Sequence, residues 1–442
     1  MTSTKPRTGL LAGYRVIDLT TFISGPFCTQ ILADLGADVV KIEPPQGDTS
    51  RSVPPHFVGE DSAYFLAMNR GKRSLAVDLK TPEGLDLVKR LIATADVVIE
   101  NFRPGVAKRL GLDATILRTQ RPRLIWASIS GFGQTGPWRD KPAYDMNVQA
   151  LSGVMSITGE PGRPAVRVGI PVGDTVAGMY AAIAINAALA DRERTGTGQE
   201  IDISMLDCQL AMLSYHGTYA LVAGTVPQPQ GTRHDSIPTY RSFAARDGRE
   251  IVVTAITETM WQGLCLALDV PQLLGDPEFQ SAALRLANRG ALWPLLEQAF
   301  LTRDAAEWIG LFEALEVPVA LIKTVPEALA DARAHGRGMI LELADANGAT
   351  IEVVGNPMKF ASLGDSVVAY PPGLGADAGD ILQDWLDLEP QDIGELFRKR
   401  ILNARDAAKA GETSAPVGQT VVGAATKAHN HPKAMAEDNG PE

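Results

Sequence analysis

The chain has 442 residues, a net charge of −11 and 45% hydrophobic residues, an ordinary hydrophobic share for a globular protein. Its length exceeds what one compact core usually holds, so two domains are expected. The negative charge argues against general affinity for nucleic acid. Three distant cysteines, and histidines without metal-site spacing outside residues 429–431, argue against a disulfide framework or a metal centre and favour a cytoplasmic protein.

Strands and helices alternate through the first part of the chain. The predicted elements are a strand at 15–19, a helix at 27–35, a strand at 38–43, a strand at 74–79, a helix at 81–93, and strands at 96–100 and 123–129. This alternation indicates an α/β fold with a Rossmann-like parallel sheet. The first strand is not followed by Gly-x-Gly-x-x-Gly, so the dinucleotide fingerprint is absent.

Several predicted loops gather on one rim of this sheet. Ligands bind beyond the carboxyl ends of parallel strands, which places residues 20–26, 43–51, 79–80 and 101–109 on that rim. The cations there or shortly after are Lys41, Lys80, Arg103, Lys108, Arg109, Arg139 and Lys141. They are candidates to bind phosphate groups, although cations on loops most often form only a solvated face.

Asp174 stands where a Pro- and Gly-containing segment meets a nearly uncharged helix predicted over 176–189. Asp is a preferred helix N-cap, because its side chain accepts a free backbone N–H. Alternatively, Thr175 caps the helix and Asp174 faces a ligand as an ionised nucleophile, favoured by the helix dipole and by N–H groups that can hold an oxyanion. The preceding Asp145 is either an acid/base partner of Asp174 or a turn or cap residue.

The helix after Asp174 is rich in alanine and is interrupted by Asn186. No uncharged apolar run reaches the roughly 18 residues that a membrane span needs, so this helix is expected to be buried core without membrane contact. The N-terminus lacks the layout of a signal peptide.

A strand is expected at 200–204, a helix at 205–222 and a linker at 227–231. After this linker the pattern of alternating strands and helices ends. Hairpins with turns at Asp247-Gly248 and Asn347-Gly348 are expected there, together with helices that include 281–301. The predicted organisation is a disordered lead at 1–9, a large α/β domain at 10–225, a small α+β domain at 226–335, a return segment at 336–403 that completes the large domain, and a disordered tail at 404–442.

An ordered set of short motifs resembles a known family. The motifs span residues 36–45 (GADVVKIEPP), 69–74 (NRGKRS), 78–84 (DLKTPEG), 100–105 (ENFRPG), 130–137 (SGFGQTGP), 149–153 (QALSG) and Asp174 through 195–199 (TGTGQ). Their order and spacing resemble the class III coenzyme A (CoA) transferases, the formyl-CoA and carnitine-CoA transferase group, over about residues 10–400.

The resemblance implies that Asp174 attacks an acyl-CoA thioester, forming a mixed anhydride and then an aspartyl-CoA thioester. It implies a homodimer of interlocked rings, with CoA and acyl-CoA as substrates and no permanently bound cofactor or metal. The CoA contacts implied by the family are Ile23, Ser24, Val77, Asp78, Leu79, Lys80, Asn101, Phe102, Arg103, Arg109 and Lys141.

The chain departs from the family's formyl transferase at three places. Ile23 replaces a Gln, Pro44 replaces an Arg on the adenine side, and residues 230–235 replace a glycine run, so formyl or oxalate specificity is not expected. Arg233 and His234, at the domain junction, are candidates to bind the second carboxylate of a dicarboxylate such as succinate. Equally, Arg233 is an ordinary surface residue.

The alternative enzyme is an α-methylacyl-CoA racemase, which shares the fold and needs two bases. Tyr144 stands where the racemases have a histidine, and a phenol is a poor base at neutral pH. A transferase is therefore favoured. A third possibility, a CoA-binding regulator without catalysis, is disfavoured by the intact Asp174.

Overall fold

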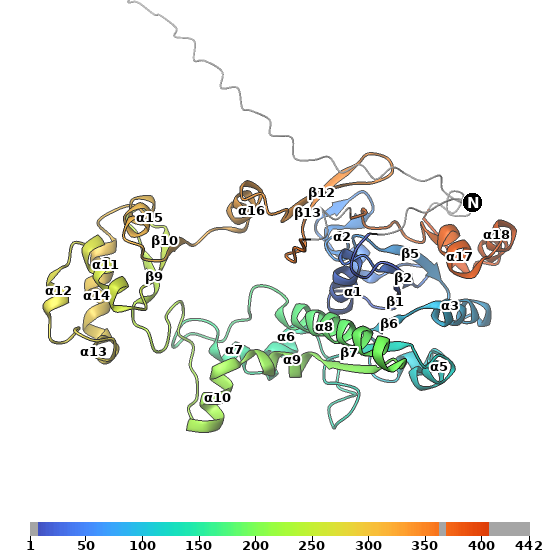
Figure 1. The fold of residues 1–442 in the computed structure, drawn as a ribbon, viewed down its shortest axis with the longest axis horizontal. Coiled ribbons are helices and arrows are strands. Elements are labelled where there is room, and N and C mark those ends of the chain that lie inside the picture. Colours follow the sequence, from blue (N-terminus) through green and yellow to red (C-terminus); the bar gives the residue numbers. More distant parts are fainter. Residues whose placement is uncertain (1–7, 362–367, 406–442) are drawn as a thin grey trace, which may run out of the picture.

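The computed structural model describes residues 8–361 and 368–405, arranged as a large lobe and a smaller lobe set apart from it (Figure 1). Most of the predicted lead at 1–9 and tail at 404–442 lies outside the described residues. Two residues assigned to the tail belong to the fold instead, because Ala404 is buried and the guanidinium of Arg405 bonds to the Asp61 carboxylate at 2.9 and 3.0 Å.

The large lobe is built on a seven-stranded sheet in the order β14-β5-β2-β1-β6-β7-β8. Its strands are β1 (Arg15–Asp18), β2 (Asp38–Glu43), β5 (Arg73–Val77), β6 (Val97–Glu100), β7 (Ile125–Ser130), β8 (Glu200–Ser204) and β14 (Leu402–Asn403). All neighbours are parallel except β14, which pairs antiparallel with β5. The predicted α/β fold with a mostly parallel sheet is confirmed. The chain winds outward from β1 to β2 and β5, then crosses to β6 on the other side of β1.

Helices cover both faces of this sheet because its strands alternate buried side chains between two cores. Val16 and Val97 face one core, whereas their neighbours Ile17 and Val98 face the other. The first core is covered by α1 (Ser24–Asp34), α6 (Asp145–Leu151), α8 (Val172–Thr195) and α9 (Met205–Met212). The second is covered by α3 (Pro82–Thr94), α5 (Ala114–Gln120), α17 (Ala378–Leu386) and α18 (Pro390–Arg398).

Helix α8 is the central helix of the first core. By length and composition alone it is long and apolar enough to cross a membrane, contrary to the expectation from the sequence. The same test is passed by core helices of soluble proteins, and Ala177, Ala181 and Ile185 of α8 are fully buried against the sheet and α1. The helix ends at Gly196, whose φ of 75° is the left-handed conformation in which helices commonly end on glycine.

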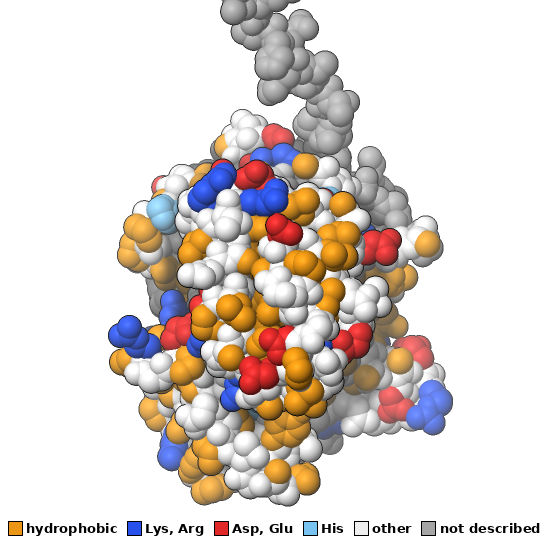
Figure 2. Space-filling model, turned by 90° about the vertical axis from the view of Figure 1, so that its left-hand side faces the viewer, with side chains coloured by type: hydrophobic (Ala, Val, Ile, Leu, Met, Phe, Trp, Pro, Cys, Tyr) orange, Lys and Arg blue, Asp and Glu red, His pale blue; other side chains and the backbone are white. Residues whose placement is uncertain are grey.

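The small lobe has its own core. It contains β9 (Tyr240–Ala244), β10 (Glu250–Thr254), β11 (Val319–Leu321), α11 (Glu258–Ala267), α12 (Gln272–Gly275), α13 (Ala282–Ala287), α14 (Arg289–Phe300) and α15 (Ala305–Ala314). Phe243, Phe300 and Trp308 pack at its centre. Seen from this end, hydrophobic side chains lie scattered among acidic and basic ones (Figure 2).

The remaining elements are short. They are η1 (Thr49–Ser52), β3 (Phe57–Val58), β4 (Asp61–Ser62), α2 (Ala63–Leu66), α4 (Val106–Arg109), α7 (Val154–Ile157), α10 (Ser214–Ala223), α16 (Val325–Ala334), β12 (Ile340–Ala344) and β13 (Thr350–Val354). The hairpins predicted at Asp247-Gly248 and Asn347-Gly348 are confirmed as β9–β10 and β12–β13.

Two long helices of the prediction are each broken in two. The helix expected at 205–222 splits into α9 and α10 because Ser214, the residue at which α10 begins, adopts a φ of 51°, which the interior of a continuous α-helix does not allow. The helix expected at 281–301 splits into α13 and α14 at Asn288.

Candidate active site

The site lies where β1 and β6 end side by side, which is the point where the winding of the sheet reverses. Open parallel sheets bind ligands at this kind of switch point. The Asn101 side chain, after β6, bonds to both backbone groups of Thr21, after β1, at 2.9 Å. Its amide also donates to the Ser24 hydroxyl at 3.3 Å. The topology thus joins two of the predicted CoA contacts, Ser24 and Asn101.

Asp174 is the third residue of α8 and lies in its first turn, and it is not the helix cap. The Asp145 side chain, from α6, caps the helix instead: its Oδ1 accepts from the backbone N–H of Gly173 at 2.7 Å and of Asp174 at 3.4 Å. Thr175 is not a cap either, because its hydroxyl donates to the Pro171 carbonyl at 3.1 Å. The carboxylate of Asp174 therefore does not cap α8.

The capping by Asp145 also corrects the expected oxyanion site. The backbone N–H groups of Gly173 and Asp174 already point at Asp145, and that of Thr175 donates to the Pro171 carbonyl at 3.0 Å. The amides of this turn are thus occupied in the described structure. The Ser24 side chain is a donor close to the Asp174 carboxylate, where its hydrogen bond lowers the pKa of that carboxyl.

Two glycines of α8 allow the close packing that positions Asp174. A Cβ at Gly173 would lie 2.2 Å from Nε2 of the buried Gln209 and 2.9 Å from Oδ1 of Asp145. A Cβ at Gly178 would lie 2.6 Å from the Ser24 carbonyl oxygen. At Gly178 the close atom belongs to the backbone, so α8 can approach α1 this closely only with glycine there. At Gly173 a Cβ would displace the Gln209 amide and the Asp145 carboxylate that caps α8.

The surroundings of Asp174 disfavour its charge. Burial, and then the nearby Asp145 carboxylate, raise the pKa of Asp174 to about 7, although the hydrogen bond from Ser24 acts in the opposite direction. A carboxylate that ionises near neutral pH and is poorly hydrated is a competent nucleophile.

Tyr64 of α2 belongs to the same site and was missed by the sequence reasoning. Burial, and then the charges of Asp174 and Asp145, raise the pKa of its hydroxyl, so the hydroxyl lies within electrostatic reach of both carboxylates. Tyr64 stands between the predicted strands at 38–43 and 74–79, where no spacing or motif marks it. Only the three-dimensional structure, which brings the Tyr64 hydroxyl within electrostatic reach of both carboxylates, reveals it.

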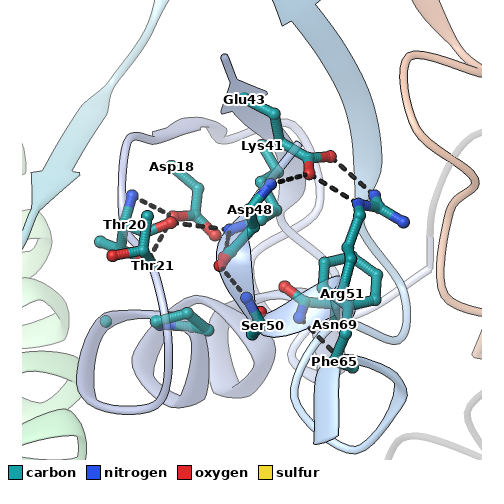
Figure 3. A network of polar contacts seen from close by, with 12 residues as sticks. Asp18, Thr20, Thr21, Lys41, Glu43, Asp48, Ser50, Arg51, Phe65 and Asn69 are labelled. Atoms are coloured by element: carbon teal, nitrogen blue, oxygen red, sulfur yellow. Dashed lines mark hydrogen bonds and ion pairs between the residues drawn. The ribbon is translucent and has the colours of Figure 1, made fainter. Parts of the chain in front are cut away.

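A buried ionic network lies behind the loop that precedes Ser24 (Figure 3). Lys41 is fully buried, its ammonium donates to the Thr20 carbonyl at 2.7 Å, and it pairs with Asp48 at 2.9 Å. Asp18 accepts from the Thr20 N–H at 2.9 Å and pairs with the buried Lys72 at 3.1 Å. Both backbone groups of Thr20 are therefore held. The prediction that Lys41 is a phosphate-binding rim cation is wrong.

The charges of this network are mutually dependent. Burial by itself would raise the pKa of Asp18, but Lys72, Lys41 and two threonine hydroxyls hold it well below its ordinary value. Burial lowers the pKa of Lys72 to about 8, although Asp18 opposes this shift. Each charge is tolerated because its partner is present.

The other predicted CoA contacts occupy the rim. Ile23 precedes α1 and is buried, as is Val77 at the end of β5, whereas Leu79 and Phe102 are half-buried against the second core. The Asp78 carboxylate accepts from the N–H of Lys80 at 2.9 Å. Six cationic side chains on or near the rim are exposed: Lys80, Arg103, Lys108, Arg109, Arg139 and Lys141. The Lys108 ammonium pairs with Asp113 at 3.0 Å, and the Lys141 ammonium lies 4.1 Å from the Trp138 ring centroid. Their contact with CoA stays a prediction.

Arg233 and His234 have partners within the chain, in the connection between the lobes. The Arg233 guanidinium pairs with Glu160 at 2.9 Å. The His234 ring stacks on Tyr240, with 5.4 Å between centroids, and its Nδ1 accepts from the Ser236 N–H at 3.1 Å. Their binding of a substrate carboxylate stays a prediction. Within residues 8–361 and 368–405, no cluster of three His, Cys, Asp or Glu side chains could hold a metal ion.

The parallel sheet and the buried carboxylate at its switch point agree with a family comparison. The model of CoA-transferase family III matches residues 11–378, and the chain belongs to this family. The family predicted from the ordered motifs is confirmed, and the protein is a CoA-transferase.

Named relatives cover almost the whole chain. Succinyl-CoA:glutarate CoA-transferase of Homo sapiens is 35% identical over 397 residues, which are 90% of each chain. Succinate–glutarate CoA-transferase of Agrobacterium fabrum is 38% identical, covering 88% of this chain and 99% of the relative. The crystal structure of a CaiB/BaiF family protein from Brucella suis superposes with a TM-score of 0.78 at 35% identity, covering 86% of this chain and 100% of that one.

Proposed function

We propose that the protein moves CoA from an acyl-CoA to a free dicarboxylic acid, with succinate on one side of the exchange and Asp174 as the nucleophile. The observation that supports this most is the Asp174 carboxylate, freed from capping by Asp145, bonded by Ser24, and given a pKa of about 7 by burial. The dicarboxylate is supported by the names of the human and Agrobacterium relatives, which act between succinate and glutarate.

In the proposed mechanism, Asp174 attacks the thioester carbonyl carbon, the C–S bond breaks, and CoA thiolate leaves a mixed anhydride. The thiolate then attacks the aspartyl carbonyl, releasing the donor acid and forming an aspartyl-CoA thioester. The acceptor carboxylate displaces the thiolate to give a second anhydride, and attack of the thiolate on the acceptor carbonyl releases the new acyl-CoA and free Asp174. In this proposal the Ser24 hydroxyl donates to the oxyanion that develops on the aspartyl carbonyl oxygen when the thiolate or the acceptor carboxylate attacks Asp174.

The competing function is racemisation of a branched acyl-CoA on the same fold. It needs a second base at the position of Tyr144, which is 69% exposed at the start of α6 and faces water. A phenol in water is a weak base at neutral pH. Transfer is therefore the proposed reaction.

The proposed assembly is a cytoplasmic homodimer of interlocked chains. Its support is the separation of the two lobes and the large apolar side chains exposed on α8 and α10, among them Ile183 at 64% and Leu221 at 89% exposure. The three buried free cysteines fit a reducing compartment. Light scattering after size-exclusion chromatography should give twice the monomer mass, and a monomer mass at micromolar concentration would contradict this assembly.

The reaction is tested by incubating the protein with succinyl-CoA and a panel of free acids, led by glutarate, and identifying the CoA products by mass spectrometry. Asp174→Asn should abolish the exchange, whereas Asp86→Asn, an exposed carboxylate on α3, should leave it unchanged. Deuterium uptake at the α carbon of a branched acyl-CoA without CoA exchange would favour the racemase instead.

A further inference from the structure

We infer that Gln149 is a positioning residue for the proposed reaction: its buried amide holds the Asp145 carboxylate against the first turn of α8 and thereby sets the electrostatic surroundings of Asp174. This inference rests on the proposed function, because it takes Asp174 as the nucleophile. Gln149 touches neither the rim cations nor Asp174 itself, so its action passes through Asp145.

The Gln149 side chain is fully buried and hydrogen-bonded at both ends. Its Nε2 donates to Oδ2 of Asp145 at 2.6 Å, and its Oε1 accepts from the backbone N–H of Val168 at 2.9 Å. Asp145 and Gln149 have the i, i+4 spacing on α6 that brings two side chains of a helix together. The amide therefore joins α6 to the segment that leads into α8.

The two partners allow one orientation of this amide. The backbone N–H of Val168 can only donate, so it requires the oxygen of Gln149, and the nitrogen of Gln149 must then face Asp145. A buried amide that loses a partner costs free energy. Gln149 therefore restrains both neighbours.

Three N–H groups converge on the Asp145 carboxylate. Oδ1 accepts from the amides of Gly173 and Asp174, at 2.7 and 3.4 Å, whereas Oδ2 accepts from Gln149. The helix amides thus hold one oxygen and Gln149 holds the other. Rotation of the carboxylate away from α8 would break a buried hydrogen bond to a charged group.

A second buried amide, that of Gln209 on α9, lies on the other side of Gly173. Its oxygen accepts from the Ser152 hydroxyl at 2.8 Å, and its Nε2 has no hydrogen-bond partner among the described residues. A Cβ at Gly173 would lie 2.2 Å from this nitrogen. Gln209 thus fills space beside the turn, and Gln149 is the amide that acts on Asp145.

Asp145 is the charge through which Gln149 acts on Asp174. After burial, the Asp145 carboxylate is the group that raises the pKa of Asp174, and the Tyr64 hydroxyl of α2 lies within electrostatic reach of both acids. From β8, the Asp202 carboxylate accepts a backbone N–H of the loop after β7.

The titratable groups on the two other helices against α8 have their own partners or are neutral. On α1, Asp34 pairs with Arg70 at 2.6 Å, and burial raises the pKa of the Cys28 thiol well above its usual range. On α9, burial and then Asp207 raise the pKa of Cys208 to about 11. Both thiols are therefore uncharged at pH 7.

The test compares two variants. Gln149→Met removes both the donor and the acceptor, whereas Gln149→Glu keeps an acceptor for Val168. In Gln149→Met, kcat for succinyl-CoA and glutarate should fall about 10- to 100-fold, the range of a lost hydrogen bond to a charged group, with the KM for succinyl-CoA changed less than about threefold. The inflection of kcat/KM near pH 7 should move downward, because a released Asp145 opposes ionisation of Asp174 less.

In Gln149→Glu the inflection should move upward, because the added acid brings further negative charge to the site. Gln30→Met, which removes another buried amide, on α1, is the control and should leave kcat and the inflection in place. An inflection that stays near pH 7 in both Gln149 variants, or moves the same way in both, would overturn the inference even if kcat fell. A purely structural role would give that result.

A stability cycle tests the inference without turnover. In urea unfolding at pH 8.5, Asp174→Asn should stabilise the unaltered protein, and it should stabilise the Gln149→Met protein less, because Asp145 is no longer held beside Asp174. Equal gains in both backgrounds would overturn the inference. If the protein exchanged no CoA with any acid, the proposed function would fail instead, and this cycle would still decide whether Gln149 acts on Asp174 through Asp145.

Discussion

Replacing Asp174 by Asn should stabilise the fold, and the gain should grow with pH. Burial and the Asp145 carboxylate raise the pKa of Asp174 from 3.8 to about 7 in the folded protein. One pKa unit corresponds to about 1.36 kcal/mol, so roughly three units set an upper limit of about 4 kcal/mol. Because Asp174 is only partly buried, relaxation of the site should reduce the observed effect to about 1–3 kcal/mol.

The sign of this effect follows from proton linkage. The unfolded chain loses the Asp174 proton near pH 3.8, whereas the folded protein keeps it until about pH 7. Stability attributable to Asp174 is therefore full below about pH 4 and is lost as the pH rises through about 7. The Asp174→Asn variant, which has no charge to bury, should be as stable as the unaltered protein at low pH and more stable at high pH.

The assay is urea unfolding of both proteins at pH 5, 7 and 8.5, followed by tryptophan fluorescence. The difference in free energy of unfolding should be roughly two fifths of its maximum at pH 5, because the unfolded carboxyl is already ionised there, and near its maximum at pH 7 and 8.5. Asp86→Asn, at an exposed carboxylate, should show a difference that does not depend on pH. A pH-independent difference at Asp174, or a variant less stable at pH 8.5, would refute the reasoning.

Other predictions concern the groups around Asp174. The kcat/KM for acyl-CoA should rise with pH through an inflection near 7, because attack needs the ionised carboxylate, and Ser24→Ala should move the inflection upward in a pH–rate profile. Helix propensity alone would make Gly178→Ala stabilising by roughly 1 kcal/mol. We expect it to lower the free energy of unfolding by about 1–3 kcal/mol instead, because the new Cβ would lie 2.6 Å from the Ser24 carbonyl oxygen. A stabilised variant in urea unfolding would contradict this. Lys72→Met should destabilise by about 3–5 kcal/mol, because it leaves Asp18 buried without the cation 3.1 Å away, and an unchanged urea midpoint would count against the network.

Much of the fold could be predicted because its signals are local. The alternation of strands and helices marks the parallel sheet, and the Asp-Gly and Asn-Gly turns mark both hairpins. The meeting of Ser24 and Asn101 also follows from topology, because both stand just beyond the carboxyl ends of adjacent parallel strands.

The rest depends on contacts between distant segments. Lys41 is charged and close to a strand end, so it resembles a rim cation until Asp48 folds back over it. Asp145 and Asp174 stand 29 residues apart, and no spacing rule predicts that one caps the helix of the other. The apolar residues around Ser214 predict one continuous helix. Ser214 adopts a left-handed φ of 51° instead, and no residue in the sequence signals this break.

The most direct test of the account is to trap the activated Asp174 carboxyl, as its anhydride or thioester, during turnover. The protein is incubated with succinyl-CoA, quenched with hydroxylamine, digested and analysed by mass spectrometry. A hydroxamate on Asp174 that is absent in Asp174→Asn is the predicted result. Full CoA exchange by the Asn variant, or a hydroxamate on another residue and none on Asp174, would contradict the central claim.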